Sequence, residues 1–128
     1  MEINYQFKKF EGRHSRQESR ITLTKSYQIG FPTQFYKDNN VTAFKYVVLF
    51  WDEDNRTIGV NFTNNEQEKN RFTIVHNEKY GGSVACRSFL KSNSIDVLKY
   101  HGRCDYEKYN LEGVGELFIF KLKEADKK

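Results

Sequence analysis

Apolar and polar side chains alternate along two short segments near the start of the chain, residues 21–24 and 27–31. A period of two places successive side chains on opposite faces of a strand, so each segment predicts a half-buried β-strand. The second alternation ends at Pro32, the only proline in the sequence. Because proline is well tolerated at the first position of a helix, a helix of one or two turns is expected directly after it.

Two longer apolar segments, 46–51 and 57–62, flank the polar segment 52–56. Their aromatic and β-branched side chains favour strands, whereas Asp and Asn in the polar segment favour a turn. Asp52 and Asp54 are therefore expected at a solvated hairpin tip rather than in an acid–base pair. The element order predicted for residues 21–63 is β-β-α-β-β.

The segment 64–70 is entirely polar and predicts a linker near the middle of the chain. Beyond it the pattern predicts a strand at 71–75, a glycine turn at 79–82, a return strand at 83–86, a short helix at 87–94 and a last strand at 116–123. Residues 99–115 contain Tyr and Gly without a clear period, and a long loop is expected there.

The two sides of the linker, residues 21–63 and 71–123, are predicted to share one element order. Residues 33–41 can be aligned with residues 87–95, and three of these positions are identical: Phe35 with Phe89, Lys37 with Lys91 and Asn39 with Asn93. An internal duplication is therefore a hypothesis. It would let one chain form a pseudo-symmetric barrel, and closing a barrel removes exposed strand edges.

The chain has 128 residues, of which 38% are hydrophobic and 16% aromatic, enough for the core of one small β-rich domain. Residues 1–20 are expected to form a basic N-terminal arm, and residues 124–128 a tail. No segment approaches the ~20 apolar residues of a membrane span, and the start lacks the features of a signal peptide. We expect a cytoplasmic protein with no membrane partner, in which Cys86 and Cys104 are reduced thiols.

The net charge of +4 permits nucleic-acid binding without requiring it, and its distribution is uneven. The cations concentrated near the start are Lys8, Lys9, Arg13, Arg16, Arg20 and Lys25, opposed there only by Glu11 and Glu18. Such a cluster is typical of an arm that binds a polyanion. A solvated N-terminal extension explains it equally well.

No residue pattern of an enzyme or a metal site is present. His101 and Cys104 are two candidate zinc ligands, but the residues needed to complete a set of four are scattered. Arg87 beside Cys86 could lower the pKa of that thiol, yet no motif supplies an oriented base. We therefore expect no catalytic residues, no metal and no cofactor.

Residues 20–36 resemble the opening of the AbrB/SpoVT/MazE family: a strand, a basic loop, a second strand ending in an apolar residue and proline, and a short amphipathic helix. Residues 46–60 resemble the second hairpin of that family. The resemblance covers residues 20–62. Phe31 stands before Pro32 where isoleucine is usual, and Ala43, Phe44 and Lys45 replace the usual Gly-Asp before the second hairpin.

The resemblance implies a swapped-hairpin or cradle-loop β-barrel that binds duplex DNA, as in a small prokaryotic transcription regulator. The nucleic-acid-binding residues that it implies in the first hairpin are Arg20, Lys25, Tyr27 and Gln28. If the duplication holds, Lys79 and Arg87 are their counterparts, and Arg13 and Arg16 of the arm would contribute. A homodimer and a monomer with internal pseudo-symmetry are both open.

Two other functions are compatible with the sequence. Aromatic and basic residues interleave at 5–10 and 100–109, as in proteins that bind single-stranded nucleic acid through stacked bases. A protein-interaction module without catalytic activity is the other alternative.

Overall fold

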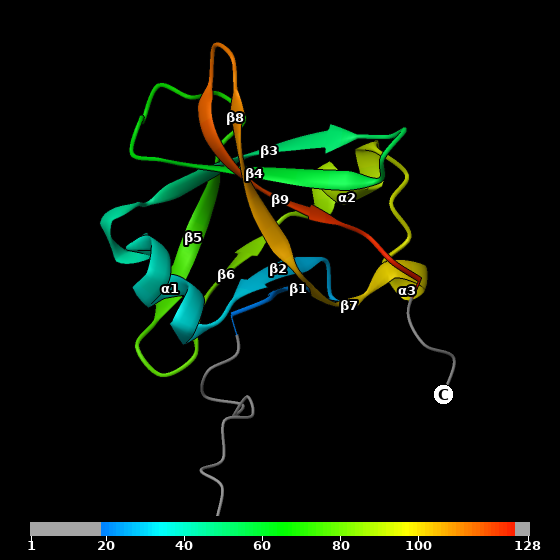
Figure 1. Ribbon diagram of the computed structural model, residues 1–128, viewed down its shortest axis with the longest axis horizontal. Coiled ribbons are helices and arrows are strands. Elements are labelled where there is room, and N and C mark those ends of the chain that lie inside the picture. The colour runs from blue at the N-terminus through cyan, green and yellow to red at the C-terminus, as the bar shows by residue number, and fades with distance from the viewer. Residues whose placement is uncertain (1–18, 125–128) are drawn as a thin grey trace, which may run out of the picture.

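The computed structural model describes residues 19–124, which form one nine-stranded antiparallel sheet curled into a nearly closed barrel (Figure 1). The strands are β1 (Ile21–Leu23), β2 (Gln28–Phe31), β3 (Tyr46–Asp52), β4 (Thr57–Thr63), β5 (Phe72–Asn77), β6 (Gly81–Ala85), β7 (Gly102–Cys104), β8 (Tyr106–Leu111) and β9 (Gly115–Lys121). Their order across the sheet is β7-β1-β2-β6-β5-β3-β4-β9-β8. Strands from the two halves of the sequence therefore alternate in pairs around the barrel.

One short stretch of chain, residues 102–111, connects the two edges of the sheet. β7 and β8 lie at opposite ends of the strand order, although only Asp105 separates them in the sequence. β7 pairs with β1, and β8 pairs with β9. Because only Asp105 separates the two edge strands in the chain, the sheet curls round into a nearly closed barrel.

Four short helical segments connect the strands: α1 (Thr33–Asn39), the 3-10 turn η2 (Val41–Ala43), α2 (Arg87–Ser92) and α3 (Val97–Tyr100). The ends of α1 and α2 are alike. Asn39 and Asn93 each donate a side-chain hydrogen bond to the backbone carbonyl four residues earlier, at 3.1 and 2.9 Å. The next residues, Asn40 and Ser94, both have positive φ, 53° and 55°. The internal duplication itself stays a prediction.

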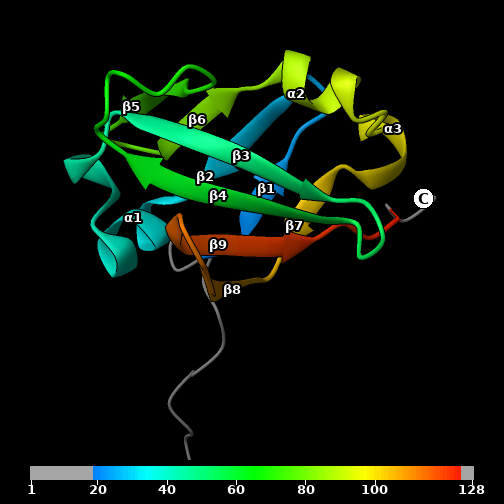
Figure 2. The same cartoon turned by 90° about the horizontal axis from the view of Figure 1, so that it is seen from above.

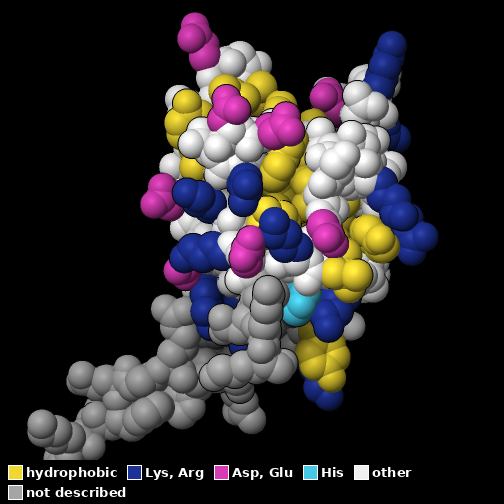
Figure 3. Space-filling model, turned by 90° about the vertical axis from the view of Figure 1, so that its right-hand side faces the viewer, with side chains coloured by type: hydrophobic (Ala, Val, Ile, Leu, Met, Phe, Trp, Pro, Cys, Tyr) yellow, Lys and Arg dark blue, Asp and Glu magenta, His cyan; other side chains and the backbone are white. Residues whose placement is uncertain are grey.

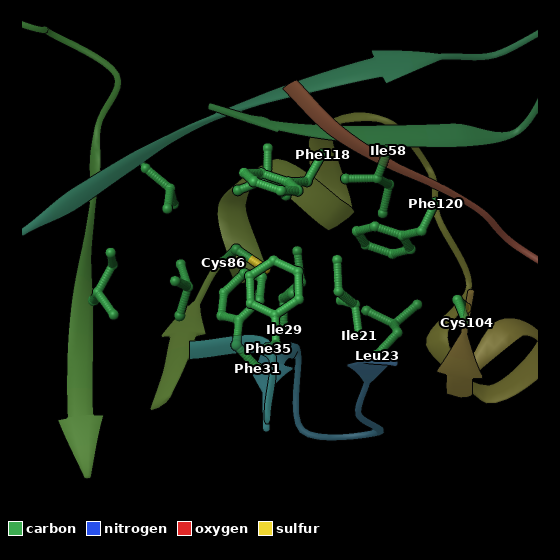
Figure 4. Packing of buried hydrophobic residues seen from close by; sticks show 14 of the residues in the cluster. Ile21, Leu23, Ile29, Phe31, Phe35, Ile58, Cys86, Cys104, Phe118 and Phe120 are labelled. Carbon is green, nitrogen blue, oxygen red and sulfur yellow. The ribbon is translucent and has the colours of Figure 1, made fainter. Parts of the chain in front are cut away.

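The core lies between two walls of the barrel (Figure 4). The labelled side chains of β1 and β2, among them Ile21 and Ile29, point towards Phe118 and Phe120 of β9 on the other wall. Aromatic rings fill the space between them. The centroid of Phe35 lies 5.2 Å from that of Phe118, in an edge-on arrangement that such rings favour. The abundance of aromatic residues in the sequence is thus used in the core.

The predicted mostly β fold with a barrel-like sheet is confirmed, whereas the swapped-hairpin connection stays a prediction. The long loop expected at 99–115 is wrong, because these residues contain β7 and β8. α3 was not predicted either, so the structure has a third short α-helix besides the two expected after Pro32 and at 87–94. The charged residues Glu107 and Lys108 hide the strand in the sequence, yet Tyr106 packs its ring 4.8 Å from that of Phe35. β8 pairs with β9 across the turn at residues 112–114, and this pairing decides its conformation.

A hydrogen-bonded pair joins α1 to β5 beside a glycine of β6. The Tyr36 hydroxyl lies 2.7 Å from Nδ1 of His76, and Nε2 of His76 lies 2.8 Å from the carbonyl oxygen of Phe44. Since a carbonyl only accepts, Nε2 donates to Phe44 and Nδ1 accepts from Tyr36. Burial raises the pKa of Tyr36 to about 12. A Cβ atom on Gly82 would overlap the Tyr36 hydroxyl.

We predict that Gly82→Ala lowers the free energy of unfolding by about 1–3 kcal/mol, because the new methyl group displaces Tyr36. The double variant Gly82→Ala, Tyr36→Phe should recover only part of this loss, since the hydroxyl is gone but Cζ of the ring still lies 2.7 Å from the new Cβ. Gly30→Ala is the matched control, because its Cβ would make only ordinary contacts at 3.8 Å or more with Thr22. Urea unfolding measures all three, and equal effects of the two glycine substitutions would contradict the prediction.

Candidate nucleic-acid interface

The turn between β1 and β2, residues 24–27, is tightly held in an unusual conformation. Tyr27 has a φ of 63°, which is uncommon for a bulky side chain and costs of order 1 kcal/mol. Thr24 fixes the turn at both ends. Its backbone N–H donates to the carbonyl of Gln28 at 2.9 Å, and its hydroxyl accepts from the N–H of Gln28 at 3.1 Å.

The same turn is hydrogen-bonded to the start of α2. The backbone N–H of Cys86, the N-cap residue of α2, donates to the carbonyl oxygen of Tyr27 at 3.0 Å. The Cys86 thiol lies 3.7 Å from that oxygen and is fully buried. The turn and the helix are therefore positioned together.

Two cations of α2 lie over the ring of Tyr27. The guanidinium carbon of Arg87 is 4.8 Å from the ring centroid, and Nζ of Lys91 is 5.1 Å from it. Residues four apart face the same side of a helix, which explains why both reach one ring. We define the Tyr27 surface as Lys25, Tyr27, Arg87 and Lys91. Cation–π contacts hold two of its charges in place.

The Tyr27 surface lies where two acid-free stretches of the sequence meet. Residues 19–37 contain Arg20, Lys25 and Lys37, residues 79–95 contain Lys79, Arg87 and Lys91, and neither stretch contains Asp or Glu. Together they carry +6, so the rest of the chain has a net charge of 4 − 6 = −2. Because β2 pairs with β6, these stretches lie side by side. Folding thus brings two positively charged stretches of the sequence together.

The outer face of the neighbouring sheet is formed mainly by small and polar residues, with the exposed apolar residue Val75 on β5. One row crosses five strands in register: Arg103 of β7, Thr22 of β1, Gly30 of β2, Ser83 of β6 and Val75 of β5. The adjacent residues Ile29 and Val84 point into the core instead. This face continues from the Tyr27 surface without an acidic side chain in the row.

The structure brings together four of the residues expected from the sequence, Lys25, Tyr27, Gln28 and Arg87. Arg20 precedes β1 and so lies at the end of that strand opposite the turn. Lys79 lies in the turn before β6, about 20 Å from Arg87 at a strand rise of ~3.3 Å per residue. It contacts the ring of Tyr80 at 5.3 Å instead.

Two expected residues, Arg13 and Arg16, lie outside the described residues. Two others were missed: Lys91 on the ring of Tyr27, and Arg103 in the row across the sheet. The absence of Asp and Glu from residues 79–95 is a signal that could have found Lys91.

The face of the molecule that carries α2 and α3 shows how the charges are arranged (Figure 3). Basic and acidic side chains are interspersed over the centre of this face, whereas Lys and Arg line its right-hand border. Viewed from above, α2 lies on one side of the barrel, and β8 and β9 on the other (Figure 2).

The other candidate groups do not assemble into a reactive site. Burial raises the pKa of the Cys86 thiol to about 12 and also raises that of Cys104, so Arg87 does not activate its neighbour. Asp52 lies at the exposed β3–β4 turn, where hydrogen bonds from Asn55 lower its pKa. Within residues 19–124, no three His, Cys, Asp or Glu side chains are grouped as metal ligands.

We predict that both thiols of the native protein resist a thiol reagent and react only when the chain unfolds. Because the pKa of Cys86 is higher in the folded state than its ordinary 9.0, its burial favours folding below that pH. The free energy of unfolding should then fall as the pH rises from about 9 towards 12. Labelling rates with and without urea test whether the thiols are protected in the native protein. Rapid labelling of the native protein at pH 8 would contradict it.

Comparison with known proteins gives no relative. No protein-family model, no curated protein and no solved structure matches this chain. In the part of the chain that the structure describes, no helix is long and apolar enough to cross a membrane. A functional assignment must therefore come from the geometry of the Tyr27 surface.

Proposed function

We propose that the protein binds duplex DNA through the Tyr27 surface, as a small transcription regulator would. The observation that supports this most directly is the pair of cations held over Tyr27, 4.8 and 5.1 Å from its ring, on stretches of sequence that contain no Asp or Glu. Cations that replace counterions on phosphate supply most of the non-specific affinity for DNA. Charges already fixed against a ring lose less side-chain entropy when they bind.

The neighbouring residues suit both positioning and readout. Lys25 lies in the turn itself and is exposed, so it can contact a second phosphate. Gln28 is opposite Ala85 on the outer face of the sheet, directly after Tyr27. Its side-chain amide can form two hydrogen bonds to an adenine edge, and the guanidinium of Arg87 can do so to guanine.

Duplex DNA is favoured over a single strand because the rings are not arranged as a stacking platform. Single-strand binders stack successive bases on exposed aromatic side chains. The ring of Tyr27 is already in contact with Arg87 and Lys91. The most exposed tyrosines of the described residues, Tyr80 and Tyr109, lie in the β5–β6 turn and on β8, far apart in the strand order.

We predict that replacing Lys25, Arg87 and Lys91 together by Ala strongly weakens binding to a random-sequence duplex. The slope of log affinity against log salt concentration should fall by about 2 to 3, because three phosphate contacts are lost. The matched control replaces Lys45, Lys69 and Lys108 by Ala, which removes the same charge from exposed positions elsewhere. Fluorescence anisotropy at several salt concentrations, with duplex and single-stranded probes, measures both variants.

Equal losses in the two triple variants would show that net charge alone, rather than this surface, determines the affinity. Undetectable binding of the parent protein at low salt would exclude the proposed function. Tighter binding of the single-stranded probe than of the duplex would favour the single-strand alternative.

The role of Tyr27 can be tested separately. We predict that Tyr27→Ala lowers the duplex affinity by about tenfold, because two cation–π contacts of roughly 0.5–1 kcal/mol each no longer hold Arg87 and Lys91. Tyr27→Phe keeps the ring and should bind like the parent. The salt slope should be unchanged in both, since every charge remains. A Tyr27→Phe variant as weak as Tyr27→Ala would contradict the positioning role and implicate the hydroxyl.

A further inference from the structure

A second surface lies on the wall formed by β3, β4, β9 and β8. It is hollowed by an open groove of about 780 Å³. Phe50 and Tyr109 lie on two sides of the groove, and Leu117 and Ile119 line it between them. Hydrophobic side chains therefore line a concave outer face of the sheet.

The strand register explains why this face is hollow. Phe50, Gly59, Ile119 and Glu107 form one row across the four strands, and Gly59 has no side chain to fill the centre. A Cβ there would come within 3.1 Å of Leu117. Leu117 itself is buried, yet it does not belong to the core cluster of the barrel. The floor is thus an apolar patch separate from the core, in which Leu117 is buried and Phe50 and Ile119 are half-buried.

The rim of the groove carries charges of both signs. Asp105 and Glu107 lie on the β8 side, and Lys121 and Lys123 lie at the end of β9. In the described part of the chain none of these four groups forms an ion pair. A partner of a single charge sign would leave one of these pairs unsatisfied, whereas a surface with the same mixture of charges can satisfy both.

We infer that this groove is where a second copy of the chain docks, forming a two-fold dimer. In such an interface the same patch of each copy faces the other, so the lysines of one copy meet the carboxylates of its partner twice. The apolar floors cover each other, and burying exposed apolar area drives the association. A second copy supplies both charge signs in the same arrangement.

This inference does not depend on DNA binding. Ile58 and Phe118 point inward from the wall of the groove towards Ile29 on the opposite wall (Figure 4). The groove and the outer face of β1, β2 and β6 therefore look in opposite directions. A dimer through the groove leaves both Tyr27 surfaces accessible and facing away from each other.

The oligomeric state tests the inference directly. Sedimentation velocity over a concentration series should show a monomer–dimer equilibrium for the parent protein. Ile119→Glu should raise the dimer dissociation constant by about a hundredfold or more, because an unpaired carboxylate enters the interface twice. Leu98→Glu, at an exposed apolar position of α3 that does not line the groove, is the matched control and should leave the dissociation constant unchanged.

A charge exchange keeps the test valid if Ile119→Glu fails to fold. One variant replaces Lys121 and Lys123 by Glu, and the other replaces Asp105 and Glu107 by Lys. Each should sediment as a monomer, because its rim becomes like-charged, whereas a mixture of the two should form a heterodimer.

Two results would overturn the inference. One is a parent protein that stays monomeric at every concentration, even if the groove binds a peptide or an apolar dye. The other is a mixture of the exchanged variants that does not associate. Neither result bears on DNA binding, which is measured independently by anisotropy.

Discussion

The antiparallel pairing of β2 with β6 is the interaction on which the rest of the structure depends. It places Ile29 opposite Val84, and both side chains are fully buried in the core. It also joins the hairpin of the first half of the sequence to that of the second half. Without this pairing the two acid-free stretches would be 42 residues apart in the chain, with no reason to share a surface. One contact thus supports both the barrel and the charge concentration.

The strand order shows how the two halves depend on each other. Neither half forms a continuous sheet, because β1 and β2 lie between β7 and β6, and β3 and β4 lie between β5 and β9. Each hairpin of the first half has strands of the second half on both sides. Both edges of each hairpin of the first half therefore pair with strands of the second half, which satisfies backbone groups that short strands would leave exposed. Residues 102–111 complete the arrangement by joining its two ends.

The two surfaces differ in the way that their side chains are held. Around Tyr27, hydrogen bonds from Thr24 and Cys86 maintain a strained turn, and the ring of that residue holds two cations. Such fixed charges suit a polyanion with regularly spaced phosphates. On the opposite wall, Gly59 leaves a hollow between aromatic and aliphatic side chains, with unpaired charges of both signs at its rim. An apolar floor surrounded by a rim with charges of both signs is typical of protein–protein interfaces.

The local pattern of apolar and polar residues was sufficient to predict the elements whose two faces differ in polarity. The alternation before Pro32 and the apolar segments around the acidic turn predicted β1 to β4 and α1, because a half-buried strand shows its period in the sequence. β8 was missed because the charged residues Glu107 and Lys108 interrupt any apolar period, although this strand forms a hairpin with the predicted strand β9. The sequence also predicted Lys25, Tyr27, Gln28 and Arg87 as site residues, through a resemblance rather than through their contacts.

The sequence by itself determined that the chain is β-rich, rich in core aromatics and positively charged in particular stretches, since these properties depend on residue type and local spacing alone. Only the tertiary structure decided which charges share a surface. Lys91 joins Tyr27 because α2 starts beside the β1–β2 turn, and Lys79 does not because it lies at the other end of β6. Likewise, the row that hollows the outer wall exists only once four strands pair in register. Contacts between distant segments depend on the path of the chain through the fold, and no local period of the sequence encodes that path.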